Sequence, residues 1–207
     1  MGFRDYIGIT GDTIPTPDPV PPWNLQGPGT AAAAESLLAF TDELDLAWQA
    51  YLACGGFPRA VTEHYRTGNV SESFMRDVAS WLHIDVDREA PVDSVPLLMA
   101  ELQARSTSPL NRSKASEALG YQTRSAFDLR LNRLVRSHGA LWAHQVNESG
   151  RRIPGAQSKL YLADPLLAWI GTYLRPGAPD PDMTSLTEGF SRSHWPRRST
   201  TFSQGAG

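Results

Sequence analysis

The sequence predicts a mainly helical protein with one two-stranded β-hairpin and a disordered tail. Three observations support this prediction. Apolar residues recur with the 3.6-residue period of a helix through most of residues 35–135. Two short alternating runs, 141–146 and 159–162, flank a turn-rich segment and indicate strands. Residues 189–207 are rich in Ser, Arg, Thr, Gln and Gly without periodicity, so we expect them to be disordered.

The first 34 residues divide into a short ordered start and a linker. Residues 1–10 mix apolar and polar side chains and predict a short helix or strand. Residues 11–34 contain six prolines and three glycines. Because proline fixes φ and removes a hydrogen-bond donor, this composition predicts an extended linker or a poorly ordered loop. We therefore interpret residues 1–34 as an N-terminal remnant followed by a linker.

Residues 35–90 are expected to form a helical subdomain. Apolar residues keep helical spacing from Glu35 to a break at Gly55-Gly56, and a second helical stretch covers 59–66 before Gly68. Ser71 has the position of an N-cap for a third helix. Within the first stretch, residues 37–43 superficially resemble a Walker B strand, but their spacing favours a helix.

Residues 91–174 are predicted to form a winged-helix domain. Asp93, Asn111 and Thr123 have the positions of N-caps for three successive helices, and Gly120 and Gly139 are expected to end the second and third. The two strand-like runs follow, with residues 147–152 at the hairpin tip, and a closing helical turn begins near 166. This is the element order of a winged helix-turn-helix. Residues 175–207 complete the chain as a proline-rich, disordered tail.

The charge of the chain is distributed unevenly. The net charge is −3, but residues 1–104 carry −10 and residues 105–159 carry +7. A basic segment within an acidic chain predicts an anionic partner for that segment. The alternative is that the basic face pairs with the acidic front half of the same chain.

The sequence contains no constellation typical of catalysis. A Walker A loop needs Gly-x-x-x-x-Gly-Lys-Ser/Thr, whereas both lysines, Lys114 and Lys159, follow serine. No two of the five histidines have the i, i+4 spacing of a metal-binding helix, and Cys54 is the single cysteine. We therefore expect no enzymatic activity, no metal and no cofactor in the isolated chain. Without a long apolar run or a secretion signal, we expect a cytoplasmic protein with no membrane partner.

Several motifs together resemble a known protein family. The carrying segments are Phe-Arg-Asp-Tyr at 3–6, Tyr-Leu-Ala-Cys-Gly-Gly-Phe-Pro-Arg-Ala-Val at 51–61, Arg-Asp-Val at 76–78, and Ser-Lys-Leu-Tyr-Leu-Ala-Asp-Pro-Leu-Leu at 158–167. Together they are similar to the C-terminal portion of prokaryotic P-loop ATPases of AAA+ and STAND-like character that end in a domain of unknown function. The resemblance covers roughly residues 3–188.

The resemblance implies a lid and a winged helix without their ATPase core. It implies that Gly56 and Pro58 line one wall of a nucleotide site when a P-loop core is supplied in trans, with ATP as the family's cofactor. It also implies that the nuclease-like domain that follows in the family begins near Leu166 and stops almost at once. A truncated gene and a split system remain alternative expectations.

Eight polar residues are candidates for nucleic-acid contact. On the third helix of the predicted winged helix, Asn132, Arg133 and Arg136 lie opposite the apolar face and are expected to reach base edges. Other cations are expected to contact phosphates or an adjacent groove: Arg112, Lys114, Arg124, Arg151 and Arg152.

Two functions therefore stay open. The first is a non-catalytic lid and winged-helix fragment that acts as a regulatory or interaction module of an AAA+-like ATP-binding protein. The second is a free-standing winged-helix protein that binds double-stranded DNA.

Overall fold

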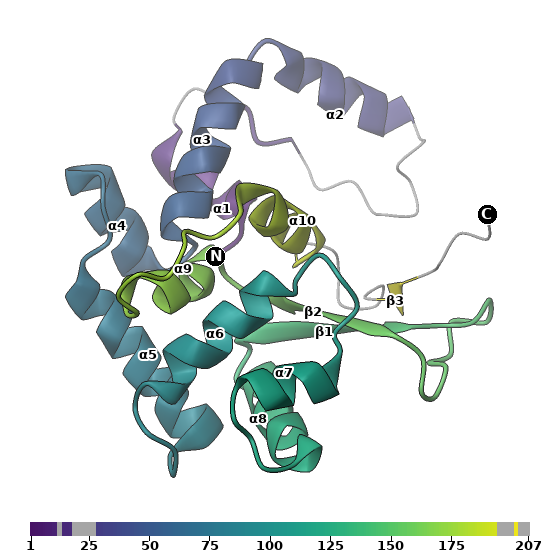
Figure 1. Cartoon of the computed structure of the whole chain (residues 1–207). Helices are drawn as coiled ribbons and strands as arrows, with labels where there is room; N and C mark the ends of the chain where they lie inside the picture. The colour runs from purple at the N-terminus through teal and green to yellow at the C-terminus, as the bar shows by residue number, and fades with distance from the viewer. Residues whose placement is uncertain (12–13, 18–27, 194–200, 203–207) are drawn as a thin grey trace.

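A computed structural model describes residues 1–11, 14–17, 28–193 and 201–202. Within these ranges the protein is mainly helical, with ten helices and a small β-sheet (Figure 1). The helices are α1 (Phe3–Thr10), α2 (Pro28–Leu38), α3 (Thr41–Cys54), α4 (Pro58–Thr67), α5 (Glu72–Asp87), α6 (Ser94–Ala104), α7 (Arg112–Ala118), α8 (Arg124–Arg136), α9 (Pro165–Tyr173) and α10 (Met183–Ser193). The strands are β1 (Ala140–Gln145), β2 (Ser158–Leu162) and β3 (Thr201–Phe202).

The predicted linker is partly wrong, because α2 begins at Pro28 inside it. Alanines 31–34 have the highest helix propensity, and proline is well tolerated in the first turn, where its missing N–H has no partner to lose. The remaining linker residues 12–13 and 18–27 lie outside the described residues. Residues 1–10 form a helix rather than a strand.

The helical stretch expected from Glu35 to Cys54 is interrupted by a turn at residues 39–40. The Thr41 hydroxyl donates a hydrogen bond to the Leu38 carbonyl oxygen, at 2.8 Å. A side chain that binds the backbone in this way offers it an alternative to the helical hydrogen-bond ladder. The Walker B-like segment 37–43 forms the end of α2, the turn at 39–40 and the start of α3, so it is helical except at this turn and is not a strand.

Three of the four predicted N-caps are confirmed. The side chains of Ser71, Asn111 and Thr123 accept hydrogen bonds from backbone N–H groups in the first turns of α5, α7 and α8. Asp93 holds the N-cap position of α6, but its side chain makes no capping bond. Its backbone is helical (φ −73°, ψ −4°), unlike the extended backbone that directs a capping side chain at the first turn.

The two glycines after α7 and α8 serve different purposes. Gly120 has φ +70° and ends α7 as predicted, because glycine adopts this left-handed conformation without strain. The prediction that Gly139 ends α8 is wrong: α8 ends at Arg136, and the left-handed residue is His138, with φ +61°. Gly139 instead permits a close approach, since a Cβ there would lie 2.4 Å from Leu134 Cδ1.

The expected antiparallel hairpin is present and follows the three helices α6, α7 and α8. Strand β1 pairs with β2 in a register that places Ala140 opposite Leu162 and His144 opposite Ser158. The tip beyond the strands is tied by a hydrogen bond from the Asn147 N–H to the Arg151 carbonyl oxygen, at 2.9 Å. Figure 1 shows the tip extending well beyond the helices. The two-residue β3 pairs with β1 in parallel.

The buried side chains form one cluster that includes both predicted subdomains. Residues from α1, from every helix α3 to α10 and from strands β1 and β2 belong to it. Helix α9 packs against both α3 and α6, and the Trp169 indole N–H donates to the Leu52 carbonyl oxygen at 2.8 Å. The helices of 35–90 and of 91–174 therefore share a core.

The predicted disordered tail is wrong for residues 183–193, which form α10, and for residues 201–202, which form β3. The Asp182 carboxylate accepts a hydrogen bond from the Ser185 N–H at 2.8 Å, and Leu186 is fully buried. Capping and burial outweigh the polar composition of this segment. The expectation of disorder for 194–200 and 203–207 concerns residues outside the described ranges.

No helix in the described ranges combines the length and the hydrophobicity that are needed to cross a lipid bilayer.

Candidate functional site

Two motifs that are more than a hundred residues apart in the sequence meet at Asp164. Its Oδ2 accepts a hydrogen bond from the Gly56 N–H, and its Oδ1 accepts one from the Leu166 N–H, at 2.9 and 3.0 Å. One carboxylate therefore caps α9 and holds the corner between α3 and α4. The N-terminal motif lies beside them, because the ring of Phe3 packs on the ring of Tyr51, with centroids 5.6 Å apart. The contacts at this junction give a structural role to the motifs at 3–6, 51–61 and 158–167.

Both glycines of this corner are required by close contacts. Gly55 has φ +74°, and a Cβ there would lie 2.0 Å from Asp164 Oδ1. A Cβ at Gly56 would lie 1.9 Å from the Met1 carbonyl oxygen. The neighbouring Cys54 is fully buried, and burial followed by the charge of Asp164 raises the pKa of its thiol to about 12. Cys54 is therefore a packed, protonated side chain and not a nucleophile.

The two predicted nucleotide-binding residues differ in access. The Gly56 N–H is bonded to Asp164, and its carbonyl oxygen accepts a hydrogen bond from the Met1 nitrogen at 2.9 Å. Gly56 is buried, so its backbone is already used within the chain. Pro58 is exposed at the first position of α4. Of the two, Pro58 has the surface that a partner can reach.

Four of the eight predicted nucleic-acid contacts bond to other groups of the chain, although Arg124, Asn132 and Arg133 are exposed. Asp128 on α8 lies 3.0 Å from Arg112 and 3.8 Å from Arg124. The Asn132 amide donates to the Asp128 carbonyl oxygen, and Arg133 donates to the Val86 carbonyl oxygen at the end of α5. Arg133, predicted as a base contact, therefore contacts the backbone of α5.

The other four cations are exposed. Lys114 lies on α7, Arg136 on the last turn of α8, and Arg151 and Arg152 at the hairpin tip. None of them forms an ion pair with another residue in the described part of the chain. These four side chains therefore keep their charges available to an external anion.

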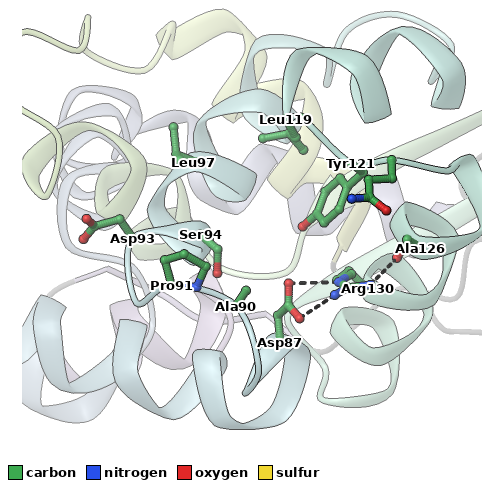
Figure 2. A pocket seen from close by; sticks show the side chains of 12 residues that line it. Asp87, Ala90, Pro91, Asp93, Ser94, Leu97, Leu119, Tyr121, Ala126 and Arg130 are labelled. Carbon is green, nitrogen blue, oxygen red and sulfur yellow. Dashed lines mark hydrogen bonds and ion pairs between the residues drawn. The ribbon is translucent and has the colours of Figure 1, made fainter.

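The most buried ion pair of this region is not among the sequence predictions. Arg130 on α8 binds Asp87 at the end of α5 through two parallel hydrogen bonds of 2.9 and 2.8 Å, drawn in Figure 2. Asp87 is 2% exposed, and its hydrogen bonds raise the pKa of the Arg130 guanidinium. The Arg130 guanidinium also lies 5.1 Å from the Tyr121 ring centroid. A weak sequence signal existed, since Arg130 follows Phe127 by three positions and so borders the buried face of α8.

On β1, nearby arginines contribute to the pKa of His144. Burial, then the charges of Arg152 and Arg112, lower the pKa of His144. The His144 ring lies 5.2 Å from the Trp142 ring, and Arg112 lies over Trp142 at 5.9 Å from its centroid. His144 is therefore largely neutral at pH 7 and adds no charge to the basic face.

The described residues contain no group of three or more His, Cys, Asp or Glu side chains placed to hold a metal ion. Comparison with protein-family models, with curated proteins and with solved structures finds no match to this chain.

Proposed function

We propose that this chain is a non-catalytic interaction module in which a lid-like helical part carries a winged helix as one rigid body. The single observation that carries the proposal is the buried, bidentate contact between Arg130 and Asp87. Because a buried charge is tolerated when it is paired and hydrogen-bonded, this contact favours one arrangement of α5 and α8. The Arg133 contact to the α5 backbone adds to it.

The winged-helix interpretation is supported by the order α6, α7, α8, β1, β2 and by the protruding hairpin tip (Figure 1). The partner assignment rests on the motif resemblance: a P-loop ATPase core in trans, with ATP bound by that core. Exposed Pro58 at the start of α4 supplies an apolar contact for such a partner.

The partner is tested through the genes that neighbour this one. A reading frame with Gly-x-x-x-x-Gly-Lys-Ser/Thr is co-expressed with the tagged chain, and the ATP affinity of the pair is measured by calorimetry. We expect the two proteins to co-purify. We expect the chain alone to bind ATP with no dissociation constant below about 1 mM. The Pro58→Asp variant of the chain should weaken ATP binding by the pair. Pro91→Asp, at another exposed proline, is the control. Sub-millimolar ATP binding by the isolated chain, or failure to co-purify, would contradict the proposal.

The second candidate function, binding of double-stranded DNA, is favoured by the four exposed cations on α7, on α8 and at the hairpin tip. It is tested by electrophoretic shift on random duplex DNA at rising salt. Lys114→Ala with Arg136→Ala should weaken binding and reduce the slope of log affinity against log salt by about two. This pair is preferable to Arg133, whose loss also removes a contact to α5. The control is Arg4→Ala with Arg66→Ala, two exposed arginines elsewhere. No shift at low salt would exclude this function.

A further inference from the structure

The end of α2 and the start of α3 form an arm that contributes nothing to the core. No residue between 29 and 46 belongs to the cluster of buried side chains or to the partly buried residues packed against it. Figure 1 shows α2 lying clear of the other helices. We call residues 35–46 the acidic arm, because they carry four acids and no cation.

The acidic arm combines exposed apolar side chains with acids that have no countercharge. Leu38 is 71% exposed and Leu46 is 67% exposed. Asp42 and Glu43 precede Leu46 by four and three positions, so these three side chains share one face of α3. Neither acid forms an ion pair within the described residues. The nearest cations along the chain are remote, since residues 5–58 contain no lysine or arginine.

Helix α8 presents the opposite charge around a similar apolar centre. Leu129, in the middle of its outer face, is 45% exposed. Asn132, Arg133 and Arg136 follow Leu129 by three, four and seven positions and are exposed on the same face. Arg133 bonds to a backbone carbonyl oxygen, and neither arginine forms an ion pair in the described part of the chain. The positive charge of this face is therefore uncompensated.

These two surfaces do not meet within one molecule. Figure 1 places the acidic arm and α8 at opposite sides of the protein, and no ion pair joins them within the described ranges. Each surface has an exposed leucine beside charges of a single sign, and the two signs are opposite. A second copy of the chain therefore supplies both the apolar contact and the countercharge that each surface lacks.

We propose that this protein self-associates head to tail, with the acidic arm of one copy docked on the outer face of α8 of the next. Leu46 lies against Leu129 of the partner subunit, so that apolar surface leaves water, and Asp42 and Glu43 face the arginines of that helix. Because the two contacting surfaces differ, each pair of copies still has one unoccupied arm and one unoccupied α8 face, to which further copies bind.

Sedimentation velocity of the full chain over a range of protein concentrations tests this contact. We expect the average mass to rise with concentration at low salt and to return to that of the monomer at about 0.5 M salt, where exposed charges are screened. Leu46→Ser should weaken the association about tenfold without harming the fold, because this side chain is exposed. A chain that stays monomeric at every concentration at low salt would overturn the proposal.

An exchange of charges identifies the two surfaces. Asp42→Lys with Glu43→Lys reverses the charge of the arm, and Asn132→Glu with Arg136→Glu reverses that of the α8 face. Each variant alone should stay monomeric at low salt, because like charges then meet. An equal mixture should associate, because each variant keeps the surface that the other has lost. A mixture that stays monomeric would overturn the proposal.

The control makes the same change of charge elsewhere. Asp85→Lys with Glu89→Lys, at two exposed acids near the end of α5, should associate as the unmodified chain does. Loss of association in this control would show that net charge and not the arm is responsible, which contradicts the proposal. Neither a P-loop core nor DNA takes part in these measurements. A monomeric chain therefore leaves the module proposal standing, and failure to bind an ATPase core or DNA leaves this contact.

Discussion

Gly55 is constrained twice, once by its backbone and once by its neighbour. Its φ of +74° and ψ of −166° fall in a region that is essentially restricted to glycine, and Asp164 occupies the position of a Cβ. Gly68 has nearly the same φ, +76°, but nothing lies within 4 Å of the position of its Cβ. With a ψ of 0°, Gly68 lies in the milder left-handed region, so Gly55 differs from it both in conformation and in contact.

We predict that Gly55→Ala lowers the free energy of unfolding by more than about 2 kcal/mol, through backbone strain together with the loss of Asp164 from its capping position. Gly68→Ala should cost about 1 kcal/mol, which is the conformational penalty alone. Chemical denaturation of both variants measures the difference. Equal losses would show that neither the glycine-only conformation of Gly55 nor its contact with Asp164 adds to the cost.

At the scale of the elements, the residues at the N-cap positions differ in whether their side chains form a capping hydrogen bond. Thr123 Oγ1 accepts a hydrogen bond from the Ala126 N–H at 3.1 Å, whereas Asp93 caps nothing. We predict that Thr123→Ala destabilises the protein by about 1 kcal/mol and that Asp93→Ala changes the stability by less than about 0.5 kcal/mol. Thermal unfolding compares the two variants. A loss with Asp93→Ala as large as that with Thr123→Ala would contradict the observed cap geometry.

The hairpin element has a pH dependence that follows from His144. Its pKa is lower in the folded protein than in the unfolded chain, so the unfolded state binds the proton first as the pH falls. The effect of His144 on the free energy of unfolding is absent above about pH 6.5. Below that pH the stability decreases as the pH falls toward the pKa of His144 in the folded protein. We predict that His144→Gln reduces this loss, measured by denaturation at pH 7.5 and 5.5.

A second measurement isolates the cause. Arg152→Ala should raise the pKa of His144, followed by NMR titration of the ring protons, because the Arg152 charge disfavours the imidazolium. Arg151→Ala is the matched control, since Arg151 is adjacent but is not among the charges that shift His144. A pKa that is unchanged by Arg152→Ala would leave burial and the Arg112 charge as the explanation.

At the scale of the molecule, the ion pair between α5 and α8 joins helices of the two predicted subdomains. Removing one partner leaves the other charge enclosed without compensation. We predict that Asp87→Ala lowers the stability by about 3 kcal/mol, while Asp85→Ala, an exposed acid on the same helix, changes it little.

The shared core adds a prediction about cooperativity. Denaturant unfolding followed by far-UV circular dichroism and by methyl NMR signals of Val61 and Leu134 should give one coincident transition. Two separate midpoints would show that the helices of 35–90 and of 91–174 fold independently.

The sequence determined most elements by itself, because their signals are local. Helical spacing, the caps Ser71, Asn111 and Thr123, and the two alternating runs of the hairpin each depend on residues a few positions apart. Local composition gave the wrong prediction at two places. The proline-rich linker includes Pro28, but the alanines that follow it form α2. The polar residues after Glu188 belong to α10, which is stabilised by capping at Asp182 and by burial of Leu186.

Only the tertiary structure decided which polar residues are used within the chain and which are available. Asp85 and Asp87 are two positions apart, yet one is exposed and the other is buried against Arg130, because α8 packs on one side of α5 only. Arg133 was predicted from the helix face as a base contact, and the approach of the α5 C-terminus makes it a backbone contact. The Asp164 junction likewise joins residues distant in sequence, because contact, unlike periodicity, depends on where the other helices lie.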